Sequence, residues 1–134
     1  MSGCVQATWP MLLEDVDVRT RLSARVDYRR DRPFEVSMTF FHERTPLSSW
    51  VFARDLLLDG RTAFAGEGDV LVWPDEDAAD RRICIVLSSP DGECLLTVAE
   101  SDVDLWCRRM TDLVPRGSEG RHFDMDEKLR RLLR

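Results

Sequence analysis

The sequence predicts one α+β domain in which most strands come before most helices. Apolar and polar residues alternate over residues 19–28 and again over 34–40, which is the period of a half-buried strand. The period changes to that of a helix after Ser101. Between these segments, residues 50–60 indicate a strand that continues into a helix without a loop. We therefore expect antiparallel sheet, one short mid-chain helix and two C-terminal helices.

Length and composition fit a single domain over residues 1–134. Of the 134 residues, 43% are hydrophobic and 33% are charged. The net charge of −6 argues against a nucleic-acid binder driven by overall charge, although a local basic patch is still compatible with it. No stretch reaches the ~18 apolar residues of a membrane span, and residues 1–10 do not resemble a secretory signal. We therefore expect a cytoplasmic protein.

Three strands are predicted in the N-terminal part of the chain. The first covers residues 5–13 and bends at Pro10, because strands tolerate proline only at an edge or a bulge. The second covers residues 19–28 and the third residues 34–40, with a turn at 30–33 between them.

The strand-to-helix junction follows a predicted loop. The loop covers residues 43–49 and contains Pro46. A strand over 50–53 continues into a helix over 54–59, and we expect Gly60 to end that helix as a left-handed cap. Residues 61–67 are predicted to be a loop.

Three further strands are predicted after this loop. Residues 83–87 are apolar on both faces, which is typical of a central strand or an interface. Residues 89–92 have the sequence of a tight turn, and residues 75–80 that of an acidic loop. The strands are expected at residues 70–73, ending at Pro74, at 83–87 and at 94–99.

Two helices are predicted at the C-terminal end. Ser101 is the expected N-cap of the first helix, which Pro115 ends. Asp124 or Asp126 is expected to cap the second helix. The apolar residues of the two helices are Val103, Trp106, Met110, Leu113, Val114, Leu129, Leu132 and Leu133.

No motif in the sequence predicts catalysis, a cofactor or a metal site. The chain has neither a phosphate-binding loop nor a nucleophile elbow, so we expect a non-enzyme. His42 is expected at the surface. His122 precedes Asp124 by two residues, so a His–Asp pair is one interpretation, but a histidine that bonds the loop backbone is favoured. Four cysteines form no Cys-x-x-Cys pair, and we expect them to be small core residues without disulfides. They are Cys4, Cys84, Cys94 and Cys107.

Arginines gather on one face of the predicted strand over residues 19–28 and at its end. One interpretation is a surface for an anionic partner, either a nucleic acid or an acidic protein segment. The favoured alternative is a solvated face whose arginines pair with carboxylates on neighbouring strands. The residues of this arginine face are Arg19, Arg21, Arg25 and Arg29.

Sheet edges and a strand that is apolar on both faces predict self-association. A small domain with seven strands must protect its edges, and no disulfides are expected to stabilise it. We therefore expect some apolar surface to be buried between subunits of a symmetric homo-oligomer.

Five segments of the chain, in this order, resemble the SsgA-like proteins of sporulating actinobacteria. Each is weak alone, but the common order and spacing make the combination specific. The resemblance covers residues 34–133, and the N-terminal third agrees only in pattern. The segments are WVFARDLL at 50–57, GDV and VWP within 68–74, LSSPDG and LL within 87–96, VPRGSE at 114–119 and HFDMD at 122–126.

This resemblance implies a fold and a role. The fold would be similar to that of the Whirly proteins, with two antiparallel β-sheets packed across one another, C-terminal helices and a trimer. The role would be non-enzymatic regulation of sporulation-specific cell division, in septum-site selection, by a cytoplasmic protein recruited to division septa. Expected partners are the division tubulin FtsZ and an SsgA-type protein. The signature positions are expected to be structural or at a subunit interface, and they are Trp50, Phe52, Arg54, Asp55, Trp73, His122 and Asp124.

Two functional hypotheses therefore stand side by side. The first is a protein–protein adaptor of the division machinery. The second is a Whirly-like module that binds single-stranded nucleic acid through the arginine face. The negative net charge favours the adaptor, because it repels phosphate at long range.

Overall fold

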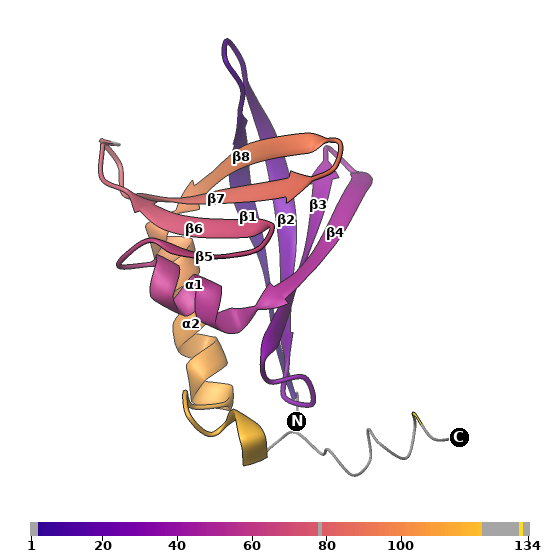
Figure 1. Ribbon diagram of the computed structural model, residues 1–134, viewed down its shortest axis with the longest axis vertical. Helices are drawn as coiled ribbons and strands as arrows, with labels where there is room; N and C mark the ends of the chain where they lie inside the picture. Colours follow the sequence, from indigo (N-terminus) through magenta and orange to yellow (C-terminus); the bar gives the residue numbers. More distant parts are fainter. Residues whose placement is uncertain (1–2, 78, 122–131, 133–134) are drawn as a thin grey trace.

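The structure is a computed structural model that describes residues 3–77, 79–121 and 132. Within these residues the fold is mixed α+β, with a mostly antiparallel sheet and few helices (Figure 1). The first half of the sheet consists of β1 (Cys4–Glu14), β2 (Arg19–Arg29), β3 (Glu35–His42) and β4 (Thr45–Ala53). The second half consists of β5 (Ala65–Glu67), β6 (Val70–Asp75), β7 (Arg82–Ser89) and β8 (Gly92–Ala99). The helices are α1 (Arg54–Gly60), α2 (Glu100–Leu113) and the short 3₁₀ helix η1 (Glu119–Arg121).

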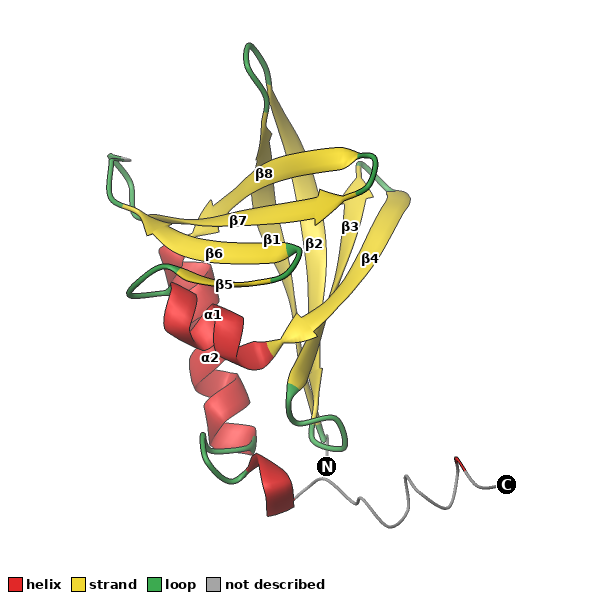
Figure 2. Ribbon diagram, viewed as in Figure 1, coloured by secondary structure: helices red, strands yellow, loops and turns green. Residues whose placement is uncertain are grey.

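One continuous sheet replaces the two predicted sheets. Its order is β4-β3-β2-β1-β8-β7-β6-β5, and both halves are meanders. β1 pairs along its whole length with β2, while only its last residues, Met11 to Glu14, pair with β8. Because strands twist, a long strand that shares only one end with its neighbour lets the two meanders cross at a large angle (Figure 2). The sheet therefore curls upon itself without breaking its hydrogen-bonded ladder.

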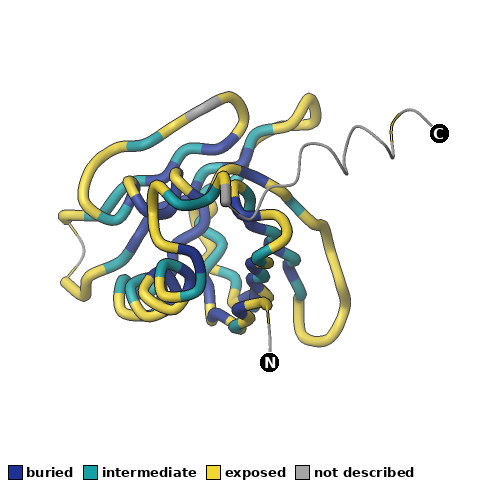
Figure 3. The backbone as a smooth tube through the Cα atoms, turned by 90° about the horizontal axis from the view of Figure 1, so that it is seen from below, coloured by how far each residue is buried: buried dark blue, intermediate teal, exposed yellow. Residues whose placement is uncertain are grey.

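The core lies in the angle between the two meanders, where both helices are packed (Figure 1). Buried and exposed residues alternate along the strands (Figure 3). On β2 the buried residues are Leu22, Ala24, Val26 and Tyr28, as the alternation predicts. Met38 of β3, Ile85 of β7 and Trp106 of α2 are also almost fully buried. One hydrophobic core therefore joins both meanders and both helices.

Prolines lie in strands at places where one side of the strand has no partner. Pro10 of β1 pairs with Ser23 of β2, and β8 begins to pair with β1 only at Met11. Pro74 lies inside β6, where the sequence predicts the strand to end, and it pairs with Ile83. β5 has already ended at this point, since it pairs only with residues 70–72 of β6. The missing N–H of each proline therefore faces no strand.

Several predicted boundaries are wrong. Residues 43–49 are not a loop, because the chain turns at Glu43 and Arg44 and β4 begins at Thr45. Pro46 is tolerated there since β4 is the edge of the sheet. The predicted loop 61–67 contains the short strand β5. Ser101 is not the N-cap of α2, because β8 continues into the helix through Ala99, which makes no side-chain cap.

Gly60 does not end α1 as a left-handed cap. It belongs to the helix, and the glycines with positive φ among the described residues are Gly68, Gly92 and Gly117. A Cβ at position 60 would lie 2.3 Å from Cγ1 of Val72 on β6. The position therefore requires glycine because α1 approaches β6 closely, and not because of its backbone conformation.

The predicted last helix, with its cap at Asp124 or Asp126, lies outside the described residues except for Leu132. Within the described part of the chain, no helix is long and apolar enough to cross a membrane.

Gly60→Ala is expected to lower the free energy of unfolding by about 1–3 kcal/mol, because the new methyl group overlaps Val72. Urea unfolding followed by circular dichroism measures this change. Gly120→Ala is the matched control, since no atom lies within 4 Å of its Cβ position. A Gly60→Ala protein as stable as its control would show that helix α1 does not pack tightly on β6.

Candidate functional site

Arg54 is the most deeply buried charged side chain in the described part of the protein. It is the first residue of α1, directly after β4, and only 1% of it is exposed. Its backbone N–H donates to the carbonyl oxygen of Phe34 at 2.9 Å, which continues the pairing of β3 with β4 into the helix. The direct change from strand to helix therefore turns the side chain toward the core.

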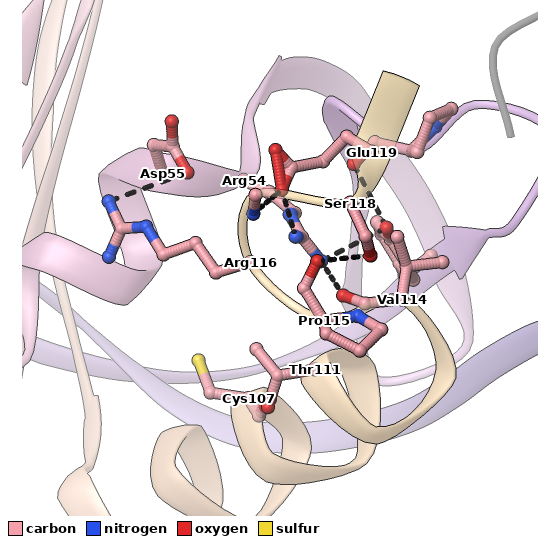
Figure 4. A network of polar contacts seen from close by, with 12 residues as sticks. Arg54, Asp55, Cys107, Thr111, Val114, Pro115, Arg116, Ser118 and Glu119 are labelled. Carbon is pink, nitrogen blue, oxygen red and sulfur yellow. Dashed lines mark hydrogen bonds and ion pairs between the residues drawn. The ribbon is translucent and has the colours of Figure 1, made fainter. Parts of the chain in front are cut away.

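The guanidinium of Arg54 joins segments that are distant in sequence. Nη1 donates to the hydroxyl oxygen of Tyr28 at 3.0 Å and to the carbonyl oxygen of Val114 at 2.8 Å. Nη2 donates to Oε1 of Glu119 at 2.9 Å (Figure 4). The guanidinium carbon also lies 5.3 Å from the centre of the Tyr28 ring, within the range of a cation–π contact. We call this set the Arg54 clamp, because it ties β2, α1, the end of α2 and η1 together.

Each partner in the clamp is itself held in place. The hydroxyl of Tyr28 donates to the carbonyl oxygen of Pro33 at 2.9 Å, so it can accept from Arg54. The rings of Tyr28 and Trp106 meet edge to face with 6.5 Å between their centroids, and those of Trp106 and Trp9 do so at 5.7 Å. Burial raises the pKa of Tyr28, and the charge of Arg54 partly offsets that increase. The phenol therefore stays neutral, and its hydroxyl accepts a hydrogen bond from Arg54 and donates one to Pro33.

Glu119 supplies the compensating negative charge. Burial by itself would raise the pKa of Glu119, but hydrogen bonds from the Gly117 amide and the Arg54 guanidinium outweigh it and hold this pKa below its usual value. A buried guanidinium without a carboxylate would be very costly, because burial removes its hydration. The carboxylate thus makes burial of Arg54 possible.

A second, exposed set of contacts reinforces the clamp. Arg116 donates to Asp59 at 2.7 Å and forms an ion pair with Asp55 at 3.5 Å. The hydrogen bond to Asp59 is the main cause that raises the pKa of Arg116 further. All three side chains are about half exposed, so these pairs contribute little stability. Their effect is to hold the segment after α2 against α1.

The signature residues predicted from sequence do not form one site. Phe52 is buried in the core, and Trp50 is half-buried beside it. Trp73 stacks on the exposed Phe64 with 5.7 Å between ring centroids. Arg54 and Asp55 are the pair that the structure does bring together, both against residues 114–119. His122 and Asp124 lie outside the described residues.

The arginine face is solvent-exposed, as its alternation predicts. Arg19 pairs with Glu14 of β1 at 2.9 Å, Arg25 with Asp27 at 3.3 Å and Arg29 with Asp31 at 2.8 Å. Arg21 forms no ion pair within the described residues. Only Glu14 belongs to a neighbouring strand, so the predicted pairing across strands is found once. Arg25 and Arg29 line a shallow groove of about 930 Å³ on this face, together with Arg30.

The remaining candidate residues, His42 and the four cysteines, do not form a site among the described residues. His42 ends β3 and is exposed. Cys84 and Cys107 are buried free thiols, and burial raises the pKa of each to about 11. Cys4 is exposed and Cys94 half-buried. Across residues 3–77 and 79–121, no group of three or more histidine, cysteine and acidic side chains is arranged to hold a metal ion.

Sequence reasoning missed both Tyr28 and Glu119 as partners of Arg54. They lie 26 and 65 residues away along the chain, and no local pattern connects them. One signal was available: Arg54 opens a helix whose next residues include three buried leucines, so a charge there must have a buried partner.

These features define a small α+β domain whose buried charged site is structural, a clamp that fixes the packing of α1 and the segment after α2. The chain belongs to the family described as Streptomyces sporulation and cell division protein SsgA, whose sequence model matches residues 22–119.

Similar proteins of known name are sporulation-specific cell division proteins. SsgB of Kineococcus radiotolerans is 44% identical over 89% of this chain and 79% of its own length. SsgB of Streptomyces coelicolor is 40% identical over 82% of this chain and 80% of its own length.

Solved structures of the family share this fold. The SsgA-like sporulation-specific cell division protein of Thermobifida fusca superposes with a TM-score of 0.86 at 32% identity, covering 98% of both chains. A structure from a study of SsgB mutations that correlate with longitudinal cell division during sporulation of Streptomyces coelicolor gives a TM-score of 0.83 at 34% identity. It covers 92% of this chain and 98% of that one.

Arg54→Met is expected to lower the free energy of unfolding by about 3–5 kcal/mol, because it leaves the Glu119 carboxylate without its positive partner and the Val114 carbonyl without its side-chain donor. Urea unfolding measures the loss. Arg116→Met, in the exposed pairs, is the control and is expected to cost less than about 1 kcal/mol. Equal costs for the two variants would contradict the clamp.

The clamp also predicts a pH dependence. The pKa of Glu119 is lowered in the folded state, so its stabilising contribution is complete above the unfolded pKa of ~4.3 and is lost as pH falls through the lower folded pKa. Between roughly pH 5 and pH 3, the wild type should therefore lose more stability than Glu119→Gln, which has no such carboxylate. Parallel loss in both proteins would show that other groups carry the acid sensitivity.

Proposed function

We propose that this protein is a non-enzymatic adaptor of sporulation-specific cell division, acting in septum-site selection and septum formation. The observation that carries the proposal is the match of the family over residues 22–119, together with relatives that are named as sporulation-specific cell division proteins. The site supports it as well, because both terminal nitrogens of the buried Arg54 guanidinium are engaged in contacts within the fold. A rigid frame of this kind suits a protein that works by presenting surfaces.

The mechanism we propose is recruitment of the division tubulin FtsZ to future septa, with an SsgA-type protein as a further partner. The protein would be cytoplasmic, concentrated at septa and assembled as a homo-oligomer, with a trimer expected from the family resemblance. Among the described residues, β4 and β5 are the two ends of the sheet, so neither has a second strand beside it. Sheet edges are the places where protein chains most readily associate.

The purified protein is expected to co-sediment with polymerised FtsZ and to stay in the supernatant with FtsZ kept unpolymerised. Arg21→Glu/Arg25→Glu tests whether the arginine face makes this contact, and Arg81→Glu/Arg108→Glu, with equal charge change on other exposed arginines, is the matched control. Circular dichroism confirms that both are folded. Failure of the wild type to pellet with polymers would contradict direct recruitment of FtsZ.

A second candidate, a Whirly-like module for single-stranded nucleic acid, has one observation in its favour. The groove on the arginine face gathers Arg25, Arg29 and Arg30. Against it, Arg25 and Arg29 are already paired with aspartates, and the net charge is −6. Three cations beside two carboxylates offer phosphate little attraction.

Titration with a fluorescent single-stranded DNA is therefore expected to show no micromolar binding at physiological salt. Arg21→Glu/Arg25→Glu should leave the titration unchanged. Micromolar affinity that falls steeply with added salt, and that this double variant abolishes, would favour the nucleic-acid module over the adaptor.

A further inference from the structure

The two edges of the sheet are protected to different degrees. β5 has only three residues, and short edge strands are one way in which proteins avoid unwanted pairing. β4 has nine residues, Thr45 to Ala53, and none of them is charged, although a third of the chain is. Charged residues and prolines on an edge strand normally prevent strand addition. β4 has no charged residue, and its one proline, Pro46, lies at its start, before the stretch from Ser49 to Ala53. Its open edge is therefore chemically suited to pair with another strand.

The pairing register shows which backbone groups of β4 are free to pair. The backbone N–H of Arg54 points toward β3, where it donates to the carbonyl oxygen of Phe34. The backbone groups of Phe52 and Trp50, two and four residues earlier, point the same way and lie opposite Val36 and Met38. Because backbone groups alternate in direction along a strand, those of Ser49, Val51 and Ala53 point away from β3. Along this outer edge they present a regular ladder for an added strand.

An apolar cleft of about 320 Å³ lies beside this edge. Leu47 and Trp50 of β4 line one side, and Leu87 and Cys94 of the β7–β8 hairpin line the other. Figure 1 shows the turn of that hairpin beside the turn between β3 and β4. Leu47 is 55% exposed, so the cleft is open to a partner. A strand added to β4 would thus cover apolar surface as well as complete a ladder.

The charges at the cleft indicate what kind of partner it takes. Its charged lining residues are Asp91 and Glu93, at the turn of the β7–β8 hairpin. Neither carboxylate forms an ion pair with another described residue. A partner that fills the cleft therefore binds most tightly if it places a positively charged side chain beside these two carboxylates.

We propose that the β4 edge and this cleft form a docking site for an extended segment of a partner protein, which adds as a strand to β4. The segment has apolar side chains at alternate positions, directed into the cleft, and a lysine or arginine beside Asp91 and Glu93. This inference rests on the proposed adaptor function and names the surface that serves it. Strand addition gives affinity through main-chain hydrogen bonds, and the cleft gives selectivity.

A second copy of the chain matches the site less well. Its own β4 could pair with the edge, but it carries no cation for Asp91 and Glu93. A nucleic acid would be repelled by the same carboxylates. The experiment below separates a second copy from the peptide by the oligomeric state, and the titration with single-stranded DNA described above tests a nucleic acid.

A blocked, fluorescein-labelled peptide, Arg-Thr-Val-Thr-Leu-Thr-Val-Thr-Arg, is the probe. Fluorescence polarisation is expected to show saturable binding to the full chain, and the same peptide with glutamates in place of its arginines should bind about tenfold more weakly. Alternate N-methylation of the peptide should abolish binding, because it removes the ladder donors. Absence of saturable binding, or equal affinity of the arginine and glutamate peptides, overturns the proposal.

Two variants test the two halves of the site. Glu93→Lys should weaken binding of the arginine peptide about tenfold and strengthen binding of the glutamate peptide. Asp112 is an exposed carboxylate on α2, and Asp112→Lys should change neither affinity. Val51→Pro removes a backbone N–H that points away from β3, while the hydrogen bonds between β4 and β3 remain. It should therefore lower the affinity for both peptides and leave the unfolding temperature unchanged. If Val51→Pro also loses stability, Glu93→Lys decides the outcome, because its side chain is exposed.

Light scattering and septal localisation separate this inference from the proposed function. If Val51→Pro and Glu93→Lys lower the oligomeric state, the edge is an interface between copies and the proposal is wrong. If the wild type co-sediments with FtsZ or localises to septa and both variants do so equally, the surface assignment fails while the adaptor function stands. A wild type that does neither, yet binds the peptide, contradicts the adaptor function instead.

Discussion

The structure depends on the burial of one positive charge. A guanidinium carries a positive charge and five N–H donors, so the fold must surround Arg54 with acceptors. Those acceptors come from Tyr28, Val114 and Glu119, which belong to three different parts of the chain. The clamp therefore requires β4 to continue directly into α1, and it requires the segment after α2 to return to the sheet. Removal of Glu119 would leave the charge of Arg54 buried without a carboxylate.

The curled sheet follows from a second constraint, the length of β1. A strand of eleven residues pairs fully with β2 and offers only its end to β8, so the two meanders remain one sheet but cross at an angle. That angle creates the space in which Trp9, Trp106 and the helices pack. The same curl brings the β7–β8 hairpin beside β4 and forms the cleft at the open edge. The curl of the sheet thus creates both the space for the core and the cleft beside β4.

Prediction from sequence succeeded for features that neighbouring residues determine. It failed for features that depend on a contact between distant parts of the chain. The alternation of β2 and the junction at Arg54 are visible because burial imposes a period on neighbouring residues. Gly60 was misassigned because its requirement comes from Val72 on another strand. Residues 45–49 were predicted to be a loop because proline disfavours central strands, and only the sheet order shows that β4 is an edge.

The class of fold, most strand faces, the strand-to-helix junction and the family resemblance can be read from the amino-acid sequence, since these depend on residue types at short separation. Only the folded chain shows that the meanders form one sheet, that Tyr28 and Glu119 enclose Arg54, and that Asp91 and Glu93 line the cleft beside β4. These three features share one cause. Strand twist, burial of charge and edge pairing join residues far apart in the chain, and no local pattern records which of them meet.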